Sequence, residues 1–365
     1  MATSAADASA STASVVAAPT VRASGLPWRW LAVSVVVLVG AMAAGTLLGP
    51  AGLPWRGTIG ALLDRLPLIS VDSGLSDRQL DILWQIRLPR VVLGGLVGSM
   101  LAAGGAAYQG VFRNPLADPY LLGVAAGAGL GATIAIAYGP AEGTLPVDPL
   151  PLAALLGGLL AVGLTYVLGA SAGGRSTAAV LLAGIAVAAF FTAGQTFVQQ
   201  QNDDTLRQVY AWILGRLSTV GWDEVLLILP YVAVSTVVLV AHRRLLDVMR
   251  VGEDETGALG VRADRVRLLV VVGATLGTAA AVSVSGLIGF AGVIVPHTVR
   301  LIAGSSYRTV LPLSFVFGAA FLVLADVVAR TVASPAELPI GVITAFVGAP
   351  FFLIVLRSNR SGRSS

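Results

Sequence analysis

The chain has 365 residues, of which 56% are hydrophobic and only 12% are charged, and its mean hydropathy is +0.85. Soluble domains carry about 25% charged residues, so this composition excludes an ordinary soluble protein and predicts a membrane protein. One spanning helix needs about 20 apolar residues, which leaves room for roughly eight to eleven crossings and little else.

Several kinds of chemistry are excluded by residue types that are absent or scarce. The chain has no Cys, and all 23 basic residues are Arg. Thiolate metal sites and a Walker A lysine are therefore impossible, so the chain cannot itself be a P-loop ATPase. The two His residues, His242 and His297, cannot form an HExxH site, and we interpret His297 as structural. The net charge of +4 is attributed to cytoplasmic loops rather than to nucleic-acid binding.

The domain organisation follows from the apolar runs. Residues 1–27 are rich in Ala, Ser and Thr and predict a disordered cytoplasmic tail. The first run, 28–49, predicts an uncleaved spanning helix, and the charged stretch 50–90 predicts an external loop. The transmembrane domain is then 28–357, with a cytoplasmic tail at 358–365. Nine further spans are predicted at 91–112, 120–138, 151–170, 178–199, 224–241, 267–284, 287–303, 309–329 and 338–356.

The orientation follows from the positions of the Arg residues. Placing the N-terminus inside assigns 15 of the 23 Arg to the inner side, as expected when cytoplasmic loops collect positive charge. An even number of spans then puts both termini in the cytoplasm. Small residues at four-residue spacing, Gly94 with Gly98 and Gly127 with Gly131, predict close helix packing.

Polar or helix-breaking residues near the membrane are the candidates for function. The segment 112–119 has two prolines four residues apart, so it is either a tight loop or a broken-helix constriction along a pathway. Arg87 and Arg90, which flank Leu88 and Pro89, either anchor a helix end or receive carboxylates from an external partner. Asp326 and Arg330 have the spacing of a helical ion pair, which either is a satisfied pair or contributes to a partner contact or the path.

The longest internal polar segment is 242–267, where Arg-rich flanks enclose acidic residues. Its length and its pattern, a short acidic helix followed by glycine and a basic exit, suggest a docking surface for a cytoplasmic protein.

The chain resembles the permease subunits of type II ABC importers for iron-siderophores, haem and cobalamin. The resemblance covers 84–356 and is carried by motifs in the family's order: 87–90, 109–119, 122–123, 181–184, 212–215, 285–290, Gly292, Pro296-His297, 324–326, 337–341 and 348–351. It implies an all-α polytopic membrane fold with about ten transmembrane helices.

The resemblance also implies roles for individual residues. Arg87, Arg90 and Arg330 align with outer-face positions that meet acidic residues of the binding protein. Asn114 and Leu116 align with one cytoplasmic gate, and Thr177 aligns with the other. The segment 252–260 is similar to the coupling helices that dock into the ATPase, with Gly252, Glu253, Glu255, Ala258, Leu259 and Gly260 as the expected contacts.

The partners implied by the resemblance are a second copy or a homologous permease, two cytoplasmic ABC ATPase subunits and an extracytoplasmic substrate-binding protein. The chain would then be a transport subunit in the bacterial cytoplasmic membrane rather than an enzyme. It would bind no cofactor or metal itself, since the partner ATPases use the ATP and Mg. An iron-siderophore is the expected substrate, with haem or cobalamin as the alternative.

Two competing classes are weaker. A secondary transporter driven by an ion gradient usually has carboxylates at the bilayer midplane, whereas here Asp326, and at an edge Asp118, are the acidic residues in or near the spans. An enzyme acting on lipid-linked substrates would need an acid-rich metal site, which the sequence does not show.

Overall fold

The computed structural model describes residues 27–65, 67, 70–140, 148–171, 177–217, 221–250, 256 and 262–361. Over these residues the secondary structure is helical, and they contain no strand, which confirms the all-α fold. The predicted N-terminal tail lies almost wholly outside the described residues, as do the predicted docking residues Gly252, Glu253, Glu255, Ala258, Leu259 and Gly260.

Ten apolar helices occupy the ten predicted spans in the described part of the chain. Seven are long enough to cross a membrane: α1 (Trp28–Leu47), α4 (Leu88–Val111), α6 (Pro149–Ser171), α7 (Thr177–Gln201), α9 (Asp223–Val248), α11 (Ala263–Ser285) and α13 (Tyr307–Thr331). Three have shorter apolar stretches: α5 (Val124–Tyr138), α12 (Ala291–Ala303) and α14 (Ile340–Ser361). The last of these runs four residues beyond the expected end of the transmembrane domain.

The stretch 50–90, predicted to be a loop, is largely helical. It holds α2 (Trp55–Asp64), α3 (Asp77–Asp81) and a π-helical stretch, Ile82–Arg87, that leads directly into α4. A capping box starts this helix, because the Ser76 hydroxyl accepts from the Gln79 amide while the Gln79 side chain accepts from Ser76 N–H at 3.0 Å. The external position of this stretch stays a prediction. Its helical content was not predicted, because hydropathy indicates where a segment enters the bilayer and not where its helix begins.

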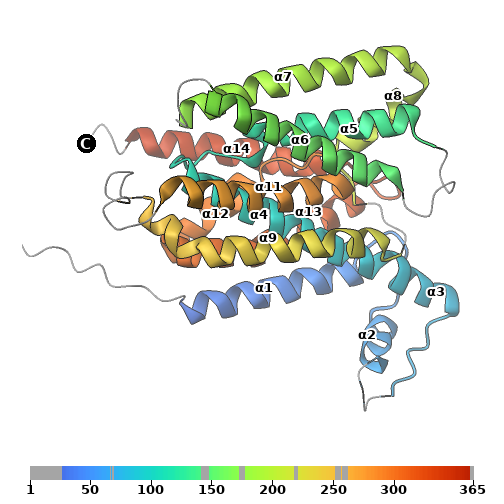
Figure 1. The fold of residues 1–365 in the computed structure, drawn as a ribbon. Coiled ribbons are helices and arrows are strands. Elements are labelled where there is room, and N and C mark those ends of the chain that lie inside the picture. Colours follow the sequence, from blue (N-terminus) through green and yellow to red (C-terminus); the bar gives the residue numbers. More distant parts are fainter. Residues whose placement is uncertain are drawn as a thin grey trace, which may run out of the picture.

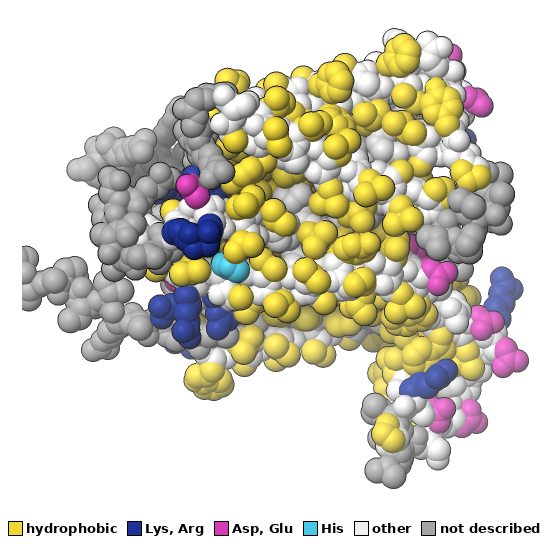
Figure 2. Space-filling view, in the orientation of Figure 1, with side chains coloured by type: hydrophobic (Ala, Val, Ile, Leu, Met, Phe, Trp, Pro, Cys, Tyr) yellow, Lys and Arg dark blue, Asp and Glu magenta, His cyan; other side chains and the backbone are white. Residues whose placement is uncertain are grey.

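The helices form a bundle with two chemically different ends. Hydrophobic side chains cover the middle of the face seen in Figure 2, and charged side chains gather at its ends. We call the end at which α9 ends and α13 begins the basic end; its residues include Arg243, Arg244, Arg250, Arg300 and Arg308. The opposite end carries α2 and α3 (Figure 1). An apolar middle between polar ends is the pattern expected of a bilayer-spanning bundle.

The helix α4 is the centre of the bundle and packs against α9, α11, α12 and α13, while α7 lies on one outer face and α1 on another (Figure 1). Small residues bring these helices together. A Cβ on Gly98 of α4 would overlap the main-chain oxygen of Gly318 in α13, and one on Gly127 would overlap that of Gly157. These contacts confirm that the predicted glycine spacings mark close helix packing.

Candidate functional site

The 112–119 segment turns sharply and then folds back into the bundle. Arg113 has a left-handed backbone (φ 50°), and the Asn114 side chain accepts from Leu116 N–H at 3.0 Å. Pro119 then lies beside α4, since a Cβ on Gly104, two turns before the end of that helix, would be 3.4 Å from Pro119 Cγ. The segment is therefore a re-entrant break in the helical backbone rather than a plain surface loop, and irregular backbone of this kind is tolerated where protein surrounds it.

The re-entrant segment meets the start of α7. A short 3₁₀ turn, Pro119–Leu122, follows it, and a Cβ on Gly184 of α7 would overlap the main-chain oxygen of Leu121. This contact accounts for the glycine in the 181–184 motif. Thr177 is the first residue of α7, but its side chain lies outside the description. The assignment of Asn114, Leu116 and Thr177 to cytoplasmic gates stays a prediction.

A second break joins motifs that are far apart in the sequence. The helix α11 ends at Ser285, Gly286 has φ 68°, and α12 begins only at Ala291. The end of α11 at this break is tied to the segment after α8 (Leu206–Ile213), and that segment is tied in turn to the start of α14. These bonds run from Arg216 N–H to Ser285 O at 2.8 Å, from Ile340 N–H to Gly215 O at 3.1 Å and from Gly341 N–H to Leu214 O at 3.1 Å.

Tyr120 connects the two breaks, which sequence reasoning missed. Its hydroxyl donates to Ile288 O at 3.1 Å and accepts from Ile288 N–H at 3.2 Å. One side chain thus satisfies both polar groups of a residue in the second break. Gln109 reinforces the junction, because its Nε2 donates to Gly292 O at 2.9 Å across the close crossing of α4 and α12. A tyrosine one position after a proline carries no local signal of such a contact.

Three predicted arginines come together at the α2–α3 end. Arg87 donates to the main-chain oxygens of Thr46 and Leu47 at 2.9 and 3.0 Å and to that of Ala51, and Arg330 donates to Gly45 O. Both side chains are only 3% exposed. They occupy the C-terminal end of α1, where the last carbonyls have no partner within the helix and carry partial negative charge.

Arg90 lies between two carboxylates. Its Nη2 is 2.8 Å from Asp326 Oδ1, and its two Nη atoms each donate to Glu337 at 3.0 Å. Asp326 also pairs with Arg330 at 3.2 Å, so the predicted helical pair exists within a larger network. Glu337, at 42% side-chain exposure, is its most accessible carboxylate. A contact of Arg87, Arg90 and Arg330 with an external partner stays a prediction, and the geometry gives each of them an intramolecular partner.

The flanks of the predicted docking segment are anchored at the basic end. At its start, Arg250 Nη1 donates to Ser305 O at 3.0 Å. Thr256 is the one residue of 251–261 that the structure describes. It is buried, and its hydroxyl donates to Val248 O at 3.3 Å. Just before the segment, Asp247 accepts from the first residues of α13. The residues just before the predicted docking segment are therefore connected to α9 and α13.

The apolar helices of spanning length and the backbone breaks between them are features of a polytopic membrane protein. The FecCD transport family model matches residues 31–358. The chain is 42% identical to the cobalamin import system permease protein BtuC of Halobacterium salinarum (84% of this chain, 80% of that one). It is 36% identical to the iron(3+)-hydroxamate import system permease protein FhuB of Bacillus subtilis (77% and 72%).

A solved structure agrees with these relatives. An inward-facing conformation of a metal-chelate type ABC transporter superposes with a TM-score of 0.78 and 28% identity, covering 91% of this chain and 99% of that one. The chain belongs to the FecCD transport family. It is an ABC-transporter permease, a transport subunit and not an enzyme, and ATP hydrolysis belongs to a separate subunit.

Proposed function

We propose that this chain forms the transmembrane path of an importer that carries a metal chelate and is driven by partner ATPases. The observation that carries the proposal is the pair of backbone breaks, 112–119 and 286–290, joined by Tyr120 inside a bundle of this family. Helix breaks within a spanning bundle allow neighbouring segments to change their packing without unfolding whole helices.

The orientation proposed here puts the basic end in the cytoplasm, with both termini there, and the α2–α3 end outside, as expected for a bacterial cytoplasmic membrane protein. The concentration of Arg at one end supports this. Two ATPase subunits would then meet the segment 252–260 on each copy, and the external binding protein would meet the end that carries α2, α3 and the Arg90 network.

A second copy, or a homologous permease, completes the path in this proposal. Support comes from large apolar side chains on α7 and α14 that the single chain leaves exposed, such as Phe190 at 74% and Phe346 at 76%. The turn Pro119–Leu122, which follows the re-entrant segment, packs against α7, and we propose that Asn114, Leu116 and Thr177 lie near the partner copy. The path would open alternately to the two sides, and nucleotide in the ATPases shifts this equilibrium only if they bind the two states with different free energies.

The substrate class is a chelated metal, and an iron-siderophore remains the sequence-based expectation, with haem as an alternative. Cobalamin is a second candidate, which the higher identity to the cobalamin permease favours (42% against 36%). Binding of cobalamin, haem and ferric siderophores to the cognate external protein distinguishes them. Tight binding of cobalamin with no binding of ferric siderophores would reject the siderophore expectation.

A carrier driven by an ion gradient is less compatible with the structure. Asp326, the carboxylate within α13, is 2% exposed and paired with both Arg90 and Arg330. A carboxylate that couples proton or sodium entry must exchange its cation during the cycle, and two fixed guanidinium partners oppose that exchange.

Uptake in proteoliposomes tests the proposal. Vesicles with the permease, the ATPases and the binding protein are expected to accumulate substrate only with ATP inside, and ATPase-free vesicles should not do so under a proton or sodium gradient. Gradient-driven uptake without ATPase would reject the proposal.

A second experiment tests the predicted docking segment. The double variant Glu253→Lys with Glu255→Lys should reduce ATPase co-purification. The control Asp204→Lys, which lies just beyond the C-terminal end of α7, should not.

A further inference from the structure

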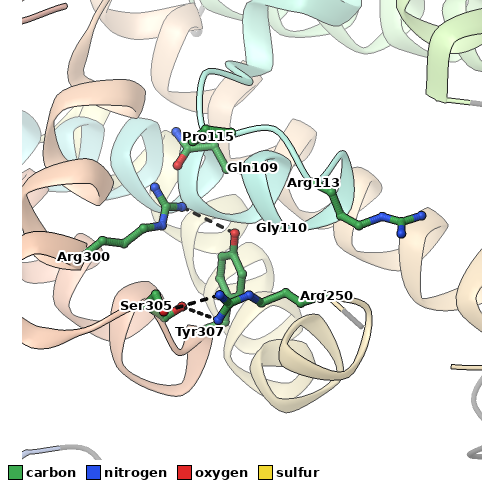
Figure 3. Close-up of a pocket in the computed structure, with 8 residues that line it drawn as sticks. All are labelled: Gln109, Gly110, Arg113, Pro115, Arg250, Arg300, Ser305 and Tyr307. Atoms are coloured by element: carbon green, nitrogen blue, oxygen red, sulfur yellow. Dashed lines mark hydrogen bonds between the residues drawn. The ribbon is translucent and has the colours of Figure 1, made fainter. Parts of the chain in front are cut away.

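A cavity lies at the basic end, beside the 112–119 segment. It has a volume of about 330 Å³, within the range of roughly 300–1000 Å³ typical of ligand pockets. Four segments that are separate in the sequence build its wall: the end of α4, the following turn, the end of α9 and the α12–α13 junction (Figure 3). The lining residues are Gln109, Gly110, Arg113, Pro115, Arg250, Arg300, Ser305 and Tyr307.

The lining residues include three Arg and no acidic residue. The Arg250 and Arg300 side chains lie beside Tyr307, whereas the Arg113 side chain points away from them (Figure 3). Among the described residues, the Asp247 carboxylate pairs with Arg250, at 4.0 Å from Nη1. That carboxylate already accepts from Ser306, Tyr307 and Arg308. Arg250 and Arg300 thus bring two guanidinium groups to one cavity, and the described carboxylate beside Arg250 is shared with other donors, which favours an anionic ligand.

Hydrogen bonds hold two of these guanidinium groups in place and leave part of their donor capacity unused. Arg250 donates to Ser305 O at 3.0 Å and to Ser305 Oγ at 3.4 Å. Arg300 Nη2 donates to the Tyr307 hydroxyl at 3.4 Å, while its buried Nη1 has no hydrogen-bond partner. A guanidinium has five N–H donors, so both groups can donate further into the cavity.

Gln109 supplies an independent sign of a ligand. Its side chain is 2% exposed, and Nε2 is committed to Gly292 O at 2.9 Å. Its Oε1 is buried and has no hydrogen-bond partner. Gln109 Oε1 is thus a buried acceptor and Arg300 Nη1 a buried donor, and neither has a hydrogen-bond partner. Leaving both unpaired costs free energy unless a ligand accepts from Arg300 and donates a hydroxyl to Gln109.

We propose that this cavity binds a phosphate group, with Arg250 and Arg300 donating to its oxygens and Gln109 Oε1 accepting from a ligand hydroxyl. The fork geometry of Arg matches phosphate oxygens. Basic pockets between spans at the membrane surface are typical sites for anionic lipid headgroups. The phosphate has two possible sources, the headgroup of an anionic phospholipid or free inorganic phosphate.

The test uses the full chain, purified in detergent and delipidated, with phosphatidylglycerol and diacylglycerol of the same acyl chains as probes. Native mass spectrometry is expected to show that phosphatidylglycerol binds in preference to diacylglycerol. The two lipids differ only in the phosphate-containing headgroup. The double variant Arg250→Gln with Arg300→Gln should bind phosphatidylglycerol at least about tenfold more weakly, because charge-assisted bonds are lost. Arg244→Gln, the same charge change on exposed α9 surface outside the cavity, is the matched control.

A second arm distinguishes the two sources, with inorganic phosphate as probe in equilibrium dialysis. Displacement of phosphatidylglycerol by phosphate identifies a lipid headgroup site. Binding of phosphate alone, with equal binding of the two lipids, identifies a free phosphate site. The proposal is wrong if neither probe binds above the diacylglycerol level, or if the double variant binds like Arg244→Gln. Loss of ATPase association alone in the double variant would also overturn it, in favour of a protein contact.

If the double glutamine variant does not fold, two conservative single variants provide the test. Arg250→Lys and Arg300→Lys keep the charge and lose the fork, and each should weaken phosphate-group binding relative to Arg244→Lys. Unchanged binding in both lysine variants contradicts the proposal.

Discussion

Asp247 accepts the main-chain N–H of Tyr307 at 2.7 Å and the Ser306 hydroxyl at 2.6 Å, so the end of α9 caps the start of α13. A carboxylate at this position satisfies N–H groups that have no partner within the helix and interacts favourably with the positive end of its dipole. Asp247 precedes the predicted docking segment, and α13 carries Asp326 near its other end. Asp247 therefore links the residues just before the predicted docking segment to the helix that carries Asp326 at the opposite end of the bundle.

Replacing Asp247 by Asn tests this connection. The variant should lose about 1 kcal/mol of stability because a charged cap becomes a neutral one. ATP-driven uptake should fall by more than the amount of folded protein does. Melting in detergent and uptake in proteoliposomes measure the two effects. Asp204→Asn, at an exposed position, is the control, and equal uptake in both variants at equal folded amounts would contradict the connection.

Replacing Arg87 by Gln tests the capping of α1. The change removes a buried charged donor from Thr46 O and Leu47 O, so the variant should be destabilised by roughly 2 kcal/mol or more. Arg87→Lys should recover part of this loss, because it restores the charge but not the fork. Thermal melting in detergent is the measurement. Arg78→Gln, exposed in α3, should melt like the parent, and an Arg87→Gln protein that does the same would exclude the capping role.

The Arg90–Glu337 pair tests the predicted binding-protein contact. Glu337 occupies both Nη atoms of Arg90, so Glu337→Gln should make Arg90 more available to an acidic partner. The affinity for the external binding protein should rise up to about fivefold at low salt and lose this gain at high salt. Surface-immobilised binding protein and permease in nanodiscs give the affinity. A weaker complex would mean that Glu337 itself, and not Arg90, makes the contact.

Tyr120→Phe tests the junction between the two backbone breaks. The change leaves the N–H and the carbonyl of Ile288 without their hydroxyl partner, at a cost of about 1–3 kcal/mol for a group that stays buried. Melting in detergent should show this loss, and uptake should fall with it. Tyr210→Phe, which removes a hydroxyl from a side chain that is 57% exposed, should change neither. A Tyr120→Phe protein with parental stability would show that the junction does not depend on this hydroxyl.

The sequence by itself determined the parts of this protein that depend on neighbouring residues. Apolar runs of spanning length predicted the ten apolar helices found in the described residues. Pro115 and Pro119 predicted the break after α4, and Gly98 predicted a close helix contact. Its motif series also identified the transport family. These features can be predicted from the sequence because they depend on local properties. The free energy of transfer into lipid depends on the composition of one segment, and a proline restricts the backbone at its own position.

Only the tertiary structure decided which distant groups meet. Arg87 caps a helix that ends 40 residues earlier, Asp247 caps one that begins 60 residues later, and Tyr120 bonds to a break 168 residues away. Three of the lining residues, Gln109, Arg250 and Arg300, come together at one cavity in the same way. A buried polar group requires a partner wherever packing supplies one, and that choice depends on how whole helices pack, which no local sequence pattern encodes.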